Sequence, residues 1–232
     1  MAKGFQQIEG VNYFETFSPV VKSATVRVIL SLAVMNQWQI RQVDVNNALL
    51  NGDLTEEVYM RQPEGFVDPQ RPDSVCKLHK ALYGLKQAPR GWFDKLKSSL
   101  IQWGFKNSKS DTSLFLRRTK SSIIIILIYV DDILITGSDC VELEKFIKLF
   151  SSAFALKDLG KLSYFLGIEV LYGHDSIYLS QKKYIRDLLA KVDMLECKGT
   201  DTPMSSSKDY RCRRVLREKW AIILKTPLIT EA

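Results

Sequence analysis

The longest uninterrupted apolar run of the chain covers residues 123–130, and a second run at 133–135 follows after two aspartates. Apolar runs of this length, bounded by turn-forming residues, are typical of buried strands. The pattern therefore predicts a β-hairpin whose tip carries Asp131 and Asp132. Two carboxylates beside an apolar core are costly unless a cation neutralises them. The hairpin tip is the first candidate for a divalent-metal site.

Helical periodicity predicts two helices in the first half of the chain. One covers residues 24–36 with Ser23 as its N-cap. The other begins near Pro89, which fits a first helical turn, and runs to about Trp103. The apolar stripes consist of Val28, Ile29, Leu32, Ala33 and Met35 in the first helix, and of Trp92, Leu96 and Leu100 in the second.

Strand-like alternation over residues 38–45 ends close to Asp44. Asp139 suits the N-cap of a later helix that runs through Phe150, with Leu143 and Ile147 also facing inward. The remaining expected elements are strands at 58–60, 75–78 and 114–116, a hairpin of strands 165–170 and 177–179 turned at 173–175, and a helix over 184–192. This order predicts an α+β fold in which helices cover one face of a sheet.

Composition and charge narrow the class of protein. Apolar residues make up 46% of the 232 residues, enough for a substantial core. The formal net charge of +7 favours an anionic partner such as nucleic acid. After Met204 come seven basic and three acidic residues, a charge of +4, so the preceding part carries 7 − 4 = +3. Ser205-Ser206-Ser207 resembles a linker, and residues 204–232 are expected to be disordered or to form one basic amphipathic helix.

The cysteines and the N-terminus point to an intracellular protein, cytoplasmic or nuclear. The cysteines are widely spaced, and with only two histidines they complete no zinc pattern, so reduced thiols are expected. No apolar signal region is present at the start. The longest apolar run is far shorter than the roughly 20 residues that span a bilayer. The cysteines are Cys76, Cys140, Cys197 and Cys212, and the histidines are His79 and His174.

The alternative to a metal site is that the paired aspartates simply form an ordinary turn, because Asp tolerates turn conformations well. Successive strand residues point to opposite faces, so regular geometry directs only one of the pair at a given metal, and Asp131 is the expected main ligand. Asp44, 87 residues earlier, taken alone is a strand-end or cap residue. If the two strands are neighbours, Asp44 and Asp131 converge, and two or three carboxylates suit Mg²⁺.

The segment 82–92 is a basic, amide-bearing loop, punctuated by Gly and Pro, that opens a helix. Helix N-termini favour phosphate, and Gln87 can hydrogen-bond a base or sugar edge. The alternative is a surface loop that simply starts a helix.

Eight segments match, in order, motifs of one protein family. They are Lys-Gly-Phe-x-Gln at 3–7, Phe-Glu-Thr-Phe-Ser-Pro-Val-Val-Lys at 14–22, Gln-Val-Asp-Val-x-x-Ala at 42–48, Glu-Val-Tyr-Met-x-Gln-Pro-Glu-Gly-Phe at 57–66, Leu-Tyr-Gly-Leu-Lys-Gln-Ala-Pro-Arg at 82–90, Tyr-Val-Asp-Asp at 129–132, Lys-Asp-Leu-Gly at 157–160 and Tyr-Phe-Leu-Gly-Ile-Glu-Val at 164–170. Across residues 2–204 the chain resembles the reverse transcriptase of copia-type LTR retrotransposons, encoded in a Pol polyprotein.

The resemblance implies a right-hand polymerase within residues 1–203, with partial fingers, a ferredoxin-like palm sheet and the start of a thumb. It implies that Asp44, Asp131 and Asp132 are the catalytic carboxylates and hold two Mg²⁺ ions, with the backbone carbonyl of Val45 as a further metal contact. The implied reaction is RNA-directed DNA synthesis, in which deoxynucleotides are added to a primer 3′ end on an RNA or DNA template.

The resemblance also implies roles outside the carboxylates. Gln87 would line the incoming nucleotide, Leu166 and Gly167 would hold the primer end, and Lys157 would assist the departing pyrophosphate. Because base pairing selects the nucleotide, the protein recognises backbone and shape, and its affinity for nucleic acid should weaken with salt.

Three departures from the family pattern modify these expectations. Leu49 stands where the family has a phenylalanine that excludes ribonucleotides, so poorer sugar discrimination is expected. The chain begins after the family's basic fingers segment, and the pattern ends near Met204, as in a truncated remnant. The alternative function is therefore a catalytically inactive remnant that binds nucleic acid non-specifically. A ferredoxin-like RNA-binding module without polymerase ancestry leaves the three placed carboxylates unexplained.

Overall fold

The computed structural model describes residues 4–173, 176–198 and 222–225. The chain divides into two compact units. Unit 1 comprises Met1–Arg27 and Gln39–Gly160, and unit 2 comprises Val28–Trp38 and Lys161–Ala232.

Unit 1 is built on a six-stranded sheet with the order β4-β5-β6-β7-β1-β8. All pairs from β4 to β1 are antiparallel, and the expected hairpin is formed by β6 and β7. The strands are β1 (Gln39–Val45), β4 (Lys106–Asn107), β5 (Leu114–Arg118), β6 (Ile123–Tyr129), β7 (Asp132–Gly137) and β8 (Leu156–Lys161).

Strand β8 was not among the predicted elements. Its sequence, Leu-Lys-Asp-Leu-Gly-Lys, carries no apolar alternation, because it lies at the edge of the sheet and is largely exposed. Arg41 on β1 forms ion pairs with Asp158 on β8 and with Glu144, so charge rather than apolar burial marks this edge.

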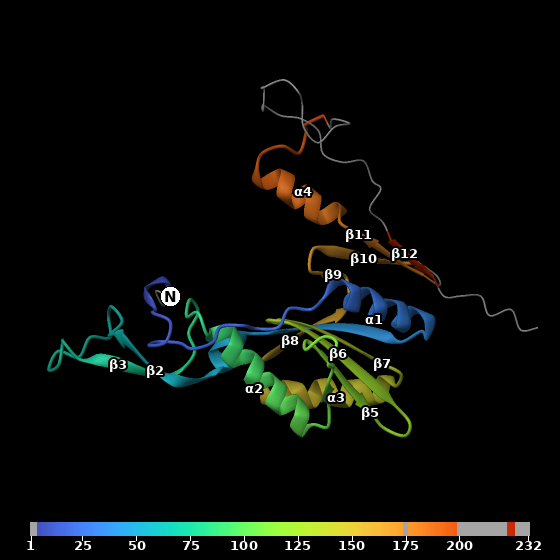
Figure 1. The fold of residues 1–232 in the computed structure, drawn as a ribbon. Helices are drawn as coiled ribbons and strands as arrows, with labels where there is room; N and C mark the ends of the chain where they lie inside the picture. The colour runs from blue at the N-terminus through green and yellow to red at the C-terminus, as the bar shows by residue number, and fades with distance from the viewer. Residues whose placement is uncertain (1–3, 174–175, 199–221, 226–232) are drawn as a thin grey trace, which may run out of the picture. The chain divides into compact units, whose positions relative to one another are not determined.

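Helices α2 (Ala88–Gln102) and α3 (Cys140–Ala153) cover one face of the six-stranded sheet (Figure 1). The predicted positions of Pro89 in the first turn of α2 and of Asp139 as the N-cap of α3 are confirmed. The core between helices and sheet is aromatic, and Trp103 meets three phenylalanines edge-on with ring centroids 5.8–6.3 Å apart. The predicted inward residues of both helices are buried, namely Trp92, Leu96, Leu100, Leu143, Ile147 and Phe150.

Helix α1 (Ser23–Met35), which belongs to unit 2 from Val28 onward, buries a different set of residues from the one that its periodicity predicted. The expected stripe at Val28, Leu32 and Met35 is 56%, 38% and 49% exposed. Of the expected positions, Ile29 and Ala33 are buried, and so are Val26, Leu30 and Val34. The helix is apolar on nearly all sides, so spacing alone cannot choose the buried face. Ser23 is the first helical residue and not the N-cap.

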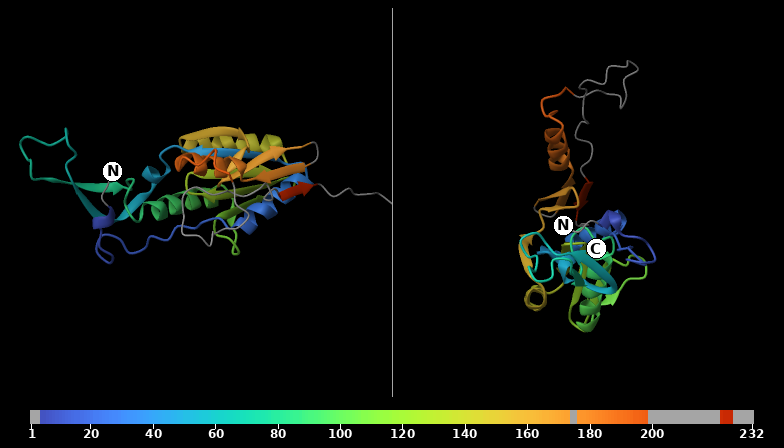
Figure 2. Two further views of the ribbon diagram at one scale, coloured as in Figure 1. Left: turned by 90° about the horizontal axis from the view of Figure 1, so that it is seen from above. Right: turned by 90° about the vertical axis from the view of Figure 1, so that its left-hand side faces the viewer.

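The rest of unit 1 consists of a two-stranded sheet and two short 3₁₀ helices. The two strands form a ribbon that projects beyond the six-stranded sheet (Figure 2). Its first strand begins earlier than the predicted 58–60. These elements are η1 (Gly4–Gln6), η2 (Ala48–Asn51), β2 (Asp53–Arg61) and β3 (Val75–Lys80).

Unit 2 contains a four-stranded antiparallel sheet with the order β12-β11-β10-β9. Helix α4 (Lys182–Lys191) follows β11 along the chain. The predicted hairpin is formed by β10 and β11, and its turn residues 174–175 lie outside the described residues. The strands are β9 (Tyr164–Phe165), β10 (Ile168–Tyr172), β11 (Ser176–Ser180) and β12 (Ile222–Lys225).

Two expectations for unit 2 are corrected. Residues 165–170 are not one strand, because Leu166 and Gly167 form a turn with φ of 50° and 78° between β9 and β10. Residues 222–225 form strand β12 on β11, so the helix expected for the basic tail is wrong for these four residues. The other residues of the tail lie outside the described part.

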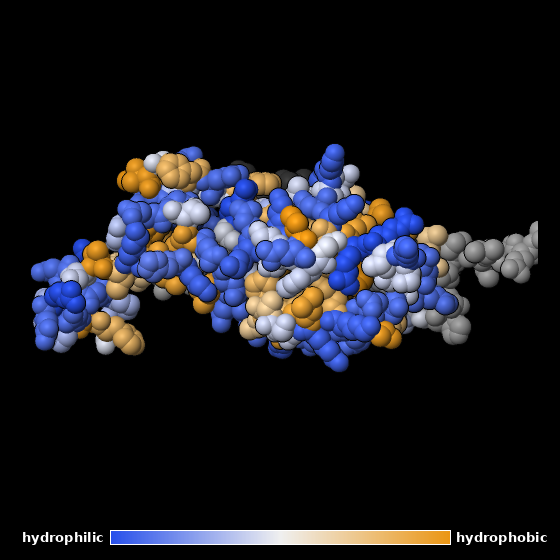
Figure 3. Space-filling model, turned by 90° about the horizontal axis from the view of Figure 1, so that it is seen from below, coloured by the Kyte–Doolittle hydropathy of each residue, from blue (hydrophilic) through white to orange (hydrophobic). Residues whose placement is uncertain are grey.

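The cysteines differ in their bonding state. Cys76 and Cys140 are free, whereas Cys197 is disulfide-bonded, so the expectation of reduced thiols is wrong for Cys197; Cys212 lies outside the described residues. Within the described part of the chain, no helix combines the length and apolarity that crossing a bilayer requires. The face drawn in Figure 3 is mainly hydrophilic, with separate apolar patches.

Candidate active site

The pairing of β1, β6 and β7 brings the three predicted aspartates to one end of the sheet. Asp44 is the register partner of Asp132. Asp131 lies in the two-residue turn that joins β6 to β7, and its carbonyl accepts a hydrogen bond of 3.0 Å from the Val45 N–H. The hypothesis that the two strands are neighbours is thus confirmed for β1 and β7. The hairpin tip is Val130-Asp131, while Asp132 already belongs to β7.

The turn is held in a strained conformation. Val130 has φ of 53°, a region that β-branched residues rarely adopt. A positive φ at only the first central residue is the pattern of a type II′ hairpin turn. The indole Nε1 of the buried Trp92 donates a 2.9 Å hydrogen bond to the Val130 carbonyl. Helix α2 therefore helps to hold the turn that presents Asp131 in this conformation.

The environment of Asp131 and Asp132 disfavours the charged forms of their carboxyl groups. Burial, followed by the charges of Asp44 and Asp132, raises the pKa of Asp131. Burial and the charge of Asp44 raise the pKa of Asp132, although a hydrogen bond from Gln42 opposes the shift. Among the described residues, Asp131 Oδ1 is buried without a hydrogen-bond partner. The site thus gathers negative charge that the described side chains do not neutralise.

Gln42 and Tyr83 are neighbours of the site that the sequence did not reveal. Gln42 Nε2 donates a 3.4 Å hydrogen bond to Asp132 Oδ1. Burial, followed by the charges of Asp131 and Asp44, raises the pKa of Tyr83. Gln42 stands two residues before Asp44 in the same strand, so the two share a face. That spacing was the available signal for Gln42.

The donor set fits Mg²⁺ in chemistry but is not a preformed cage. Hard oxygen donors and an unpartnered buried carboxylate oxygen suit this ion. In residues 4–173, 176–198 and 222–225, no three His, Cys, Asp or Glu side chains are grouped closely enough to hold a metal ion. The three aspartates are neighbours through their backbones, and their roles as ligands, with Asp131 as the main one, stay predictions.

The loop before α2 is bonded to the N-terminal segment through Gln87, and its role in binding phosphate or nucleotide stays a prediction. Gln87, at the N-cap position of α2, is 3% exposed. Its Oε1 accepts a hydrogen bond from Gln7, and its Nε2 donates one to the carbonyl of Asn12. Gln87 also lines a cleft of about 530 Å³ with residues of β2 and α2.

Three other predicted residues lie in unit 1. Leu49, in η2, is partly buried and packs against the main core and against the small cluster around Val58. Val45 is buried at the end of β1. Lys157 is exposed on β8, the neighbour of β1. Nothing in these positions tests the nucleotide or pyrophosphate roles.

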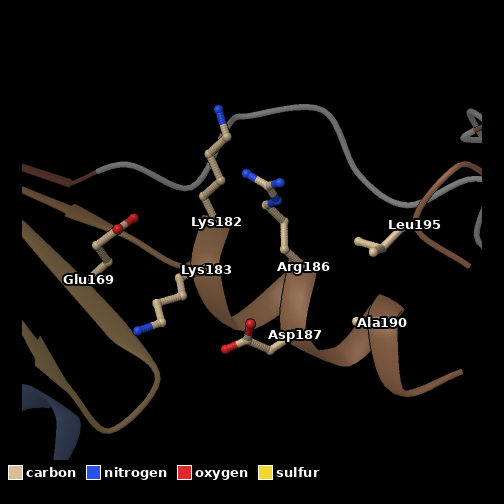
Figure 4. Close-up of a pocket in the computed structure, with 7 residues that line it drawn as sticks. All are labelled: Glu169, Lys182, Lys183, Arg186, Asp187, Ala190 and Leu195. Carbon is tan, nitrogen blue, oxygen red and sulfur yellow. The ribbon is translucent and has the colours of Figure 1, made fainter. Parts of the chain in front are cut away.

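Leu166 and Gly167 belong to unit 2. A Cβ on Gly167 would lie 3.5 Å from the ring of Tyr184. The turn lines a cleft of about 460 Å³ whose other lining residues are Tyr164, Gln181 and Tyr184. A second cleft, of about 360 Å³, lies between β10 and α4 (Figure 4). Helix α4 contributes Lys182, Lys183 and Arg186 to it.

Comparison with known proteins decides the family. The family described as reverse transcriptase (RNA-dependent DNA polymerase) matches residues 1–206. The chain belongs to this family. The predicted membership among copia-type reverse transcriptase domains of retrotransposon Pol polyproteins is confirmed by the relatives. No solved structure matches the chain.

The similar proteins are much longer than this chain. The Retrovirus-related Pol polyproteins from transposons RE2 and RE1 of Arabidopsis thaliana are 54% and 53% identical to it, over 89% of the chain and 14% of each relative. The Retrovirus-related Pol polyprotein from transposon TNT 1-94 of Nicotiana tabacum is 42% identical over 88% of the chain and 16% of the relative. The chain therefore spans about one seventh of the length of these curated relatives.

Proposed function

We propose that this reverse transcriptase domain catalyses templated addition of deoxynucleotides to a primer 3′ end, with Asp44, Asp131 and Asp132 as its catalytic carboxylates. The observation that carries the proposal is the register pair of Asp44 and Asp132, with Asp131 in the adjoining turn. Membership of the family over residues 1–206 supports the substrate classes, which are an RNA or DNA template with a primer, and dNTPs.

The three carboxylates and the Val45 carbonyl would hold two Mg²⁺ ions. When bound, the ions supply the positive charge that activates the primer hydroxyl and stabilises the departing pyrophosphate. Gln42 restrains one oxygen of Asp132, and Trp92 holds the carbonyl of the residue before Asp131. The first contact would help to orient the Asp132 side chain, and the second would hold the backbone of the turn that carries Asp131.

The remaining roles follow the same assignment. The six-stranded sheet of unit 1 corresponds to a palm, the ribbon β2–β3 to part of the fingers, and the β9–β10 turn with α4 to the start of a thumb. Leu49 and Gln87 would contact the incoming nucleotide, and Leu166 with Gly167 the primer end. Lys157 would assist the pyrophosphate. Contacts to nucleic acid would be made largely to its backbone, since base pairing selects the nucleotide.

A primer-extension assay tests the proposal. The chain is incubated with Mg²⁺, dNTPs and a primer annealed to an RNA template, beside the variant Asp131→Asn. We expect extension by the natural chain and a loss of at least a hundredfold in the variant, because a metal-binding charge is removed.

Each contrary result has a distinct meaning. Equal extension by both proteins would show that Asp131 does not act in the reaction. Binding of the primer–template without extension by the natural chain would favour the inactive, nucleic-acid-binding remnant.

A further inference from the structure

The N-terminal segment is fastened to the loop before α2 by its side chains and its backbone. Gln7 is the last residue of the motif Lys-Gly-Phe-x-Gln at 3–7. Its Nε2 donates a 2.9 Å hydrogen bond to Gln87 Oε1, and its Oε1 accepts a 2.8 Å bond from the Lys86 N–H. One side-chain amide therefore binds two successive residues, 79 and 80 positions away.

The neighbouring contacts reinforce this connection. Lys86 Nζ donates to the Gln7 carbonyl at 3.2 Å and lies 5.0 Å from the ring centre of Tyr13. Gly4 lies against the backbone of Gly84, so closely that a Cβ on Gly4 would be 1.8 Å from the Gly84 carbonyl oxygen. The segment 4–13 is thus seated on the loop through several independent contacts.

The consequence for Gln87 is a fixed amide orientation. Its oxygen must face the Gln7 donor, and its nitrogen must face the carbonyl of Asn12, 2.9 Å away. Rotating the Gln87 amide by half a turn would place its N–H group against the N–H group of Gln7, and its oxygen against the carbonyl oxygen of Asn12. A glutamine amide has a second N–H and a second lone pair, so Gln87 keeps capacity for one more partner at each atom.

We propose that Gln7 is a positioning residue for nucleotide binding, which acts by fixing the Gln87 amide. The inference rests on the proposed function, in which Gln87 contacts the incoming nucleotide. The side-chain hydrogen bonds of Gln7 go to Lys86 and Gln87, and its backbone bonds to Gly4 and Lys86, so none goes to the aspartates. Loss of Gln7 should therefore weaken nucleotide binding and leave the chemical step nearly unchanged.

The test compares four proteins by steady-state primer extension and by dTTP binding to a complex with a chain-terminated primer. They are the natural chain, Gln7→Ala, Gln7→Glu and the control Gln6→Ala, which changes the exposed neighbouring glutamine. We expect the KM and Kd for dTTP to rise about fivefold in both Gln7 variants, the order of one lost hydrogen bond. The kcat should stay within about twofold, and the control should match the natural chain.

A second measurement separates the two bonds of Gln7. Glutamate keeps an acceptor for the Lys86 N–H but loses the donor to Gln87. Exchange of the Lys86 amide hydrogen should therefore accelerate in Gln7→Ala and not in Gln7→Glu. Adding Gln87→Ala to Gln7→Ala should raise KM no further than Gln87→Ala alone, because the two residues act as one unit.

The failures are distinguishable. A natural chain that neither binds nor incorporates dTTP overturns the proposed function, and this inference with it. A natural chain that is active, with unchanged KM in Gln7→Ala or with the loss confined to kcat, overturns the inference alone. Additive effects of the two substitutions would also exclude an action of Gln7 through Gln87.

Discussion

Asp131 is a residue at which folding and the proposed chemistry make opposite demands. Its side chain is partly withdrawn from water, it is close to two other carboxylates, and its Oδ1 has no partner among the described residues. Folding favours the neutral carboxyl, whereas binding a cation needs the charged form. The metal-free protein should therefore be less stable than its core would allow, which is a common cost of acidic sites.

Asp131→Asn should stabilise the metal-free protein at neutral pH. The pKa of Asp131 is raised on folding, so the folded state holds its proton more tightly than the unfolded state. The contribution of Asp131 to stability is then greatest at low pH and falls as the pH rises through the interval above the ordinary aspartate pKa of about 3.9. Asn removes this loss, and thermal unfolding in EDTA at pH 7 should show a higher Tm, by about 2–4 °C for each kcal/mol gained.

The control for that experiment is Asp73→Asn, a change at an exposed carboxylate. The stabilising effect of Asp131→Asn should disappear below about pH 4. Mg²⁺ should raise the Tm of the natural chain more than that of the variant, because a ligand that binds the folded state stabilises it. A Tm for Asp131→Asn that is lower at pH 7 and independent of pH would contradict the prediction.

Leu49→Phe should improve discrimination against ribonucleotides. Leucine is shorter than phenylalanine and lacks a planar ring, so it offers less steric resistance to a 2′-hydroxyl. The ratio of kcat/KM for dNTP to that for the matching rNTP should rise at least tenfold in the variant, which corresponds to about 1.4 kcal/mol. Because Leu49 also packs against both cores of unit 1, Leu49→Met serves as the volume control. Equal ratios in all three proteins would show that this side chain does not meet the sugar.

At the scale of single residues, the sequence revealed those residues that are marked by their immediate neighbours in the chain. Asp44 and Asp131 were found because each stands at the end of an apolar strand, and the family motifs added the rest. Gln42 could have been found from the two-residue period of a strand, because it lies two positions before Asp44. Gln7 could not be found in that way, because its partners Lys86 and Gln87 are about 80 residues away and no pattern in the chain encodes their contact.

Among the elements, those with one apolar face were predicted and those without one were not. Helix α3 has a clear stripe and an Asp139 cap that accepts from two backbone N–H groups, and both were found. Helix α1 is apolar nearly all round, so its buried face depends on the rest of the fold. The β9–β10 turn places Leu166 in the left-handed region, which its sequence does not favour.

The start of α1 is tied to the start of β5 by a buried carboxylate. Asp111 is 4% exposed and accepts hydrogen bonds from the Thr25 hydroxyl at 2.6 Å and from the backbone N–H groups of Lys22 and Ser113, both at 3.0 Å. Burial alone would raise the pKa of Asp111, but these bonds and the charge of Lys22 outweigh it, and the pKa is lowered. The charged carboxylate therefore stabilises the folded state.

Asp111→Asn should destabilise the protein by about 1–3 kcal/mol at pH 7, because the amide brings a donor among donors. Since the pKa is lowered on folding, the contribution of Asp111 is present above the ordinary aspartate pKa and is lost as the pH falls through the folded-state value. Urea unfolding at pH 7 and at pH 3 should show the difference between variant and natural chain shrinking at the lower pH. Asp73→Asn is again the control, and a difference that is constant with pH would contradict the proposed hydrogen-bonded role.

At the scale of the molecule, the α+β class and the antiparallel sheet with helices on one face were predictable from element order. The division into units was not, because each unit joins two separate stretches of the chain. Long-range pairing decides such a division, and local periodicity carries no information about it. The net charge, by contrast, is a property of the whole molecule that can be read directly from the sequence.

Nucleic-acid binding should be salt-dependent, and residues after Met204 should supply part of the effect. The chain carries +7, of which +4 lies after Met204. Each phosphate neutralised by Lys or Arg contributes roughly 0.9 to the slope of log affinity against log salt.

Changing Arg211, Arg213, Arg214 and Arg217 to Gln lowers the net charge from +7 to 7 − 4 = +3. We expect weaker binding of an RNA–DNA duplex at low salt and a slope smaller by about 1–3, with kcat unchanged at saturating substrate. Changing Ser205, Ser206 and Ser207 to Ala tests for effects of substitution in this region without a change of charge. An unaltered slope would show that these arginines do not meet phosphates, and that the part of the chain before Met204, with only +3, supplies the binding.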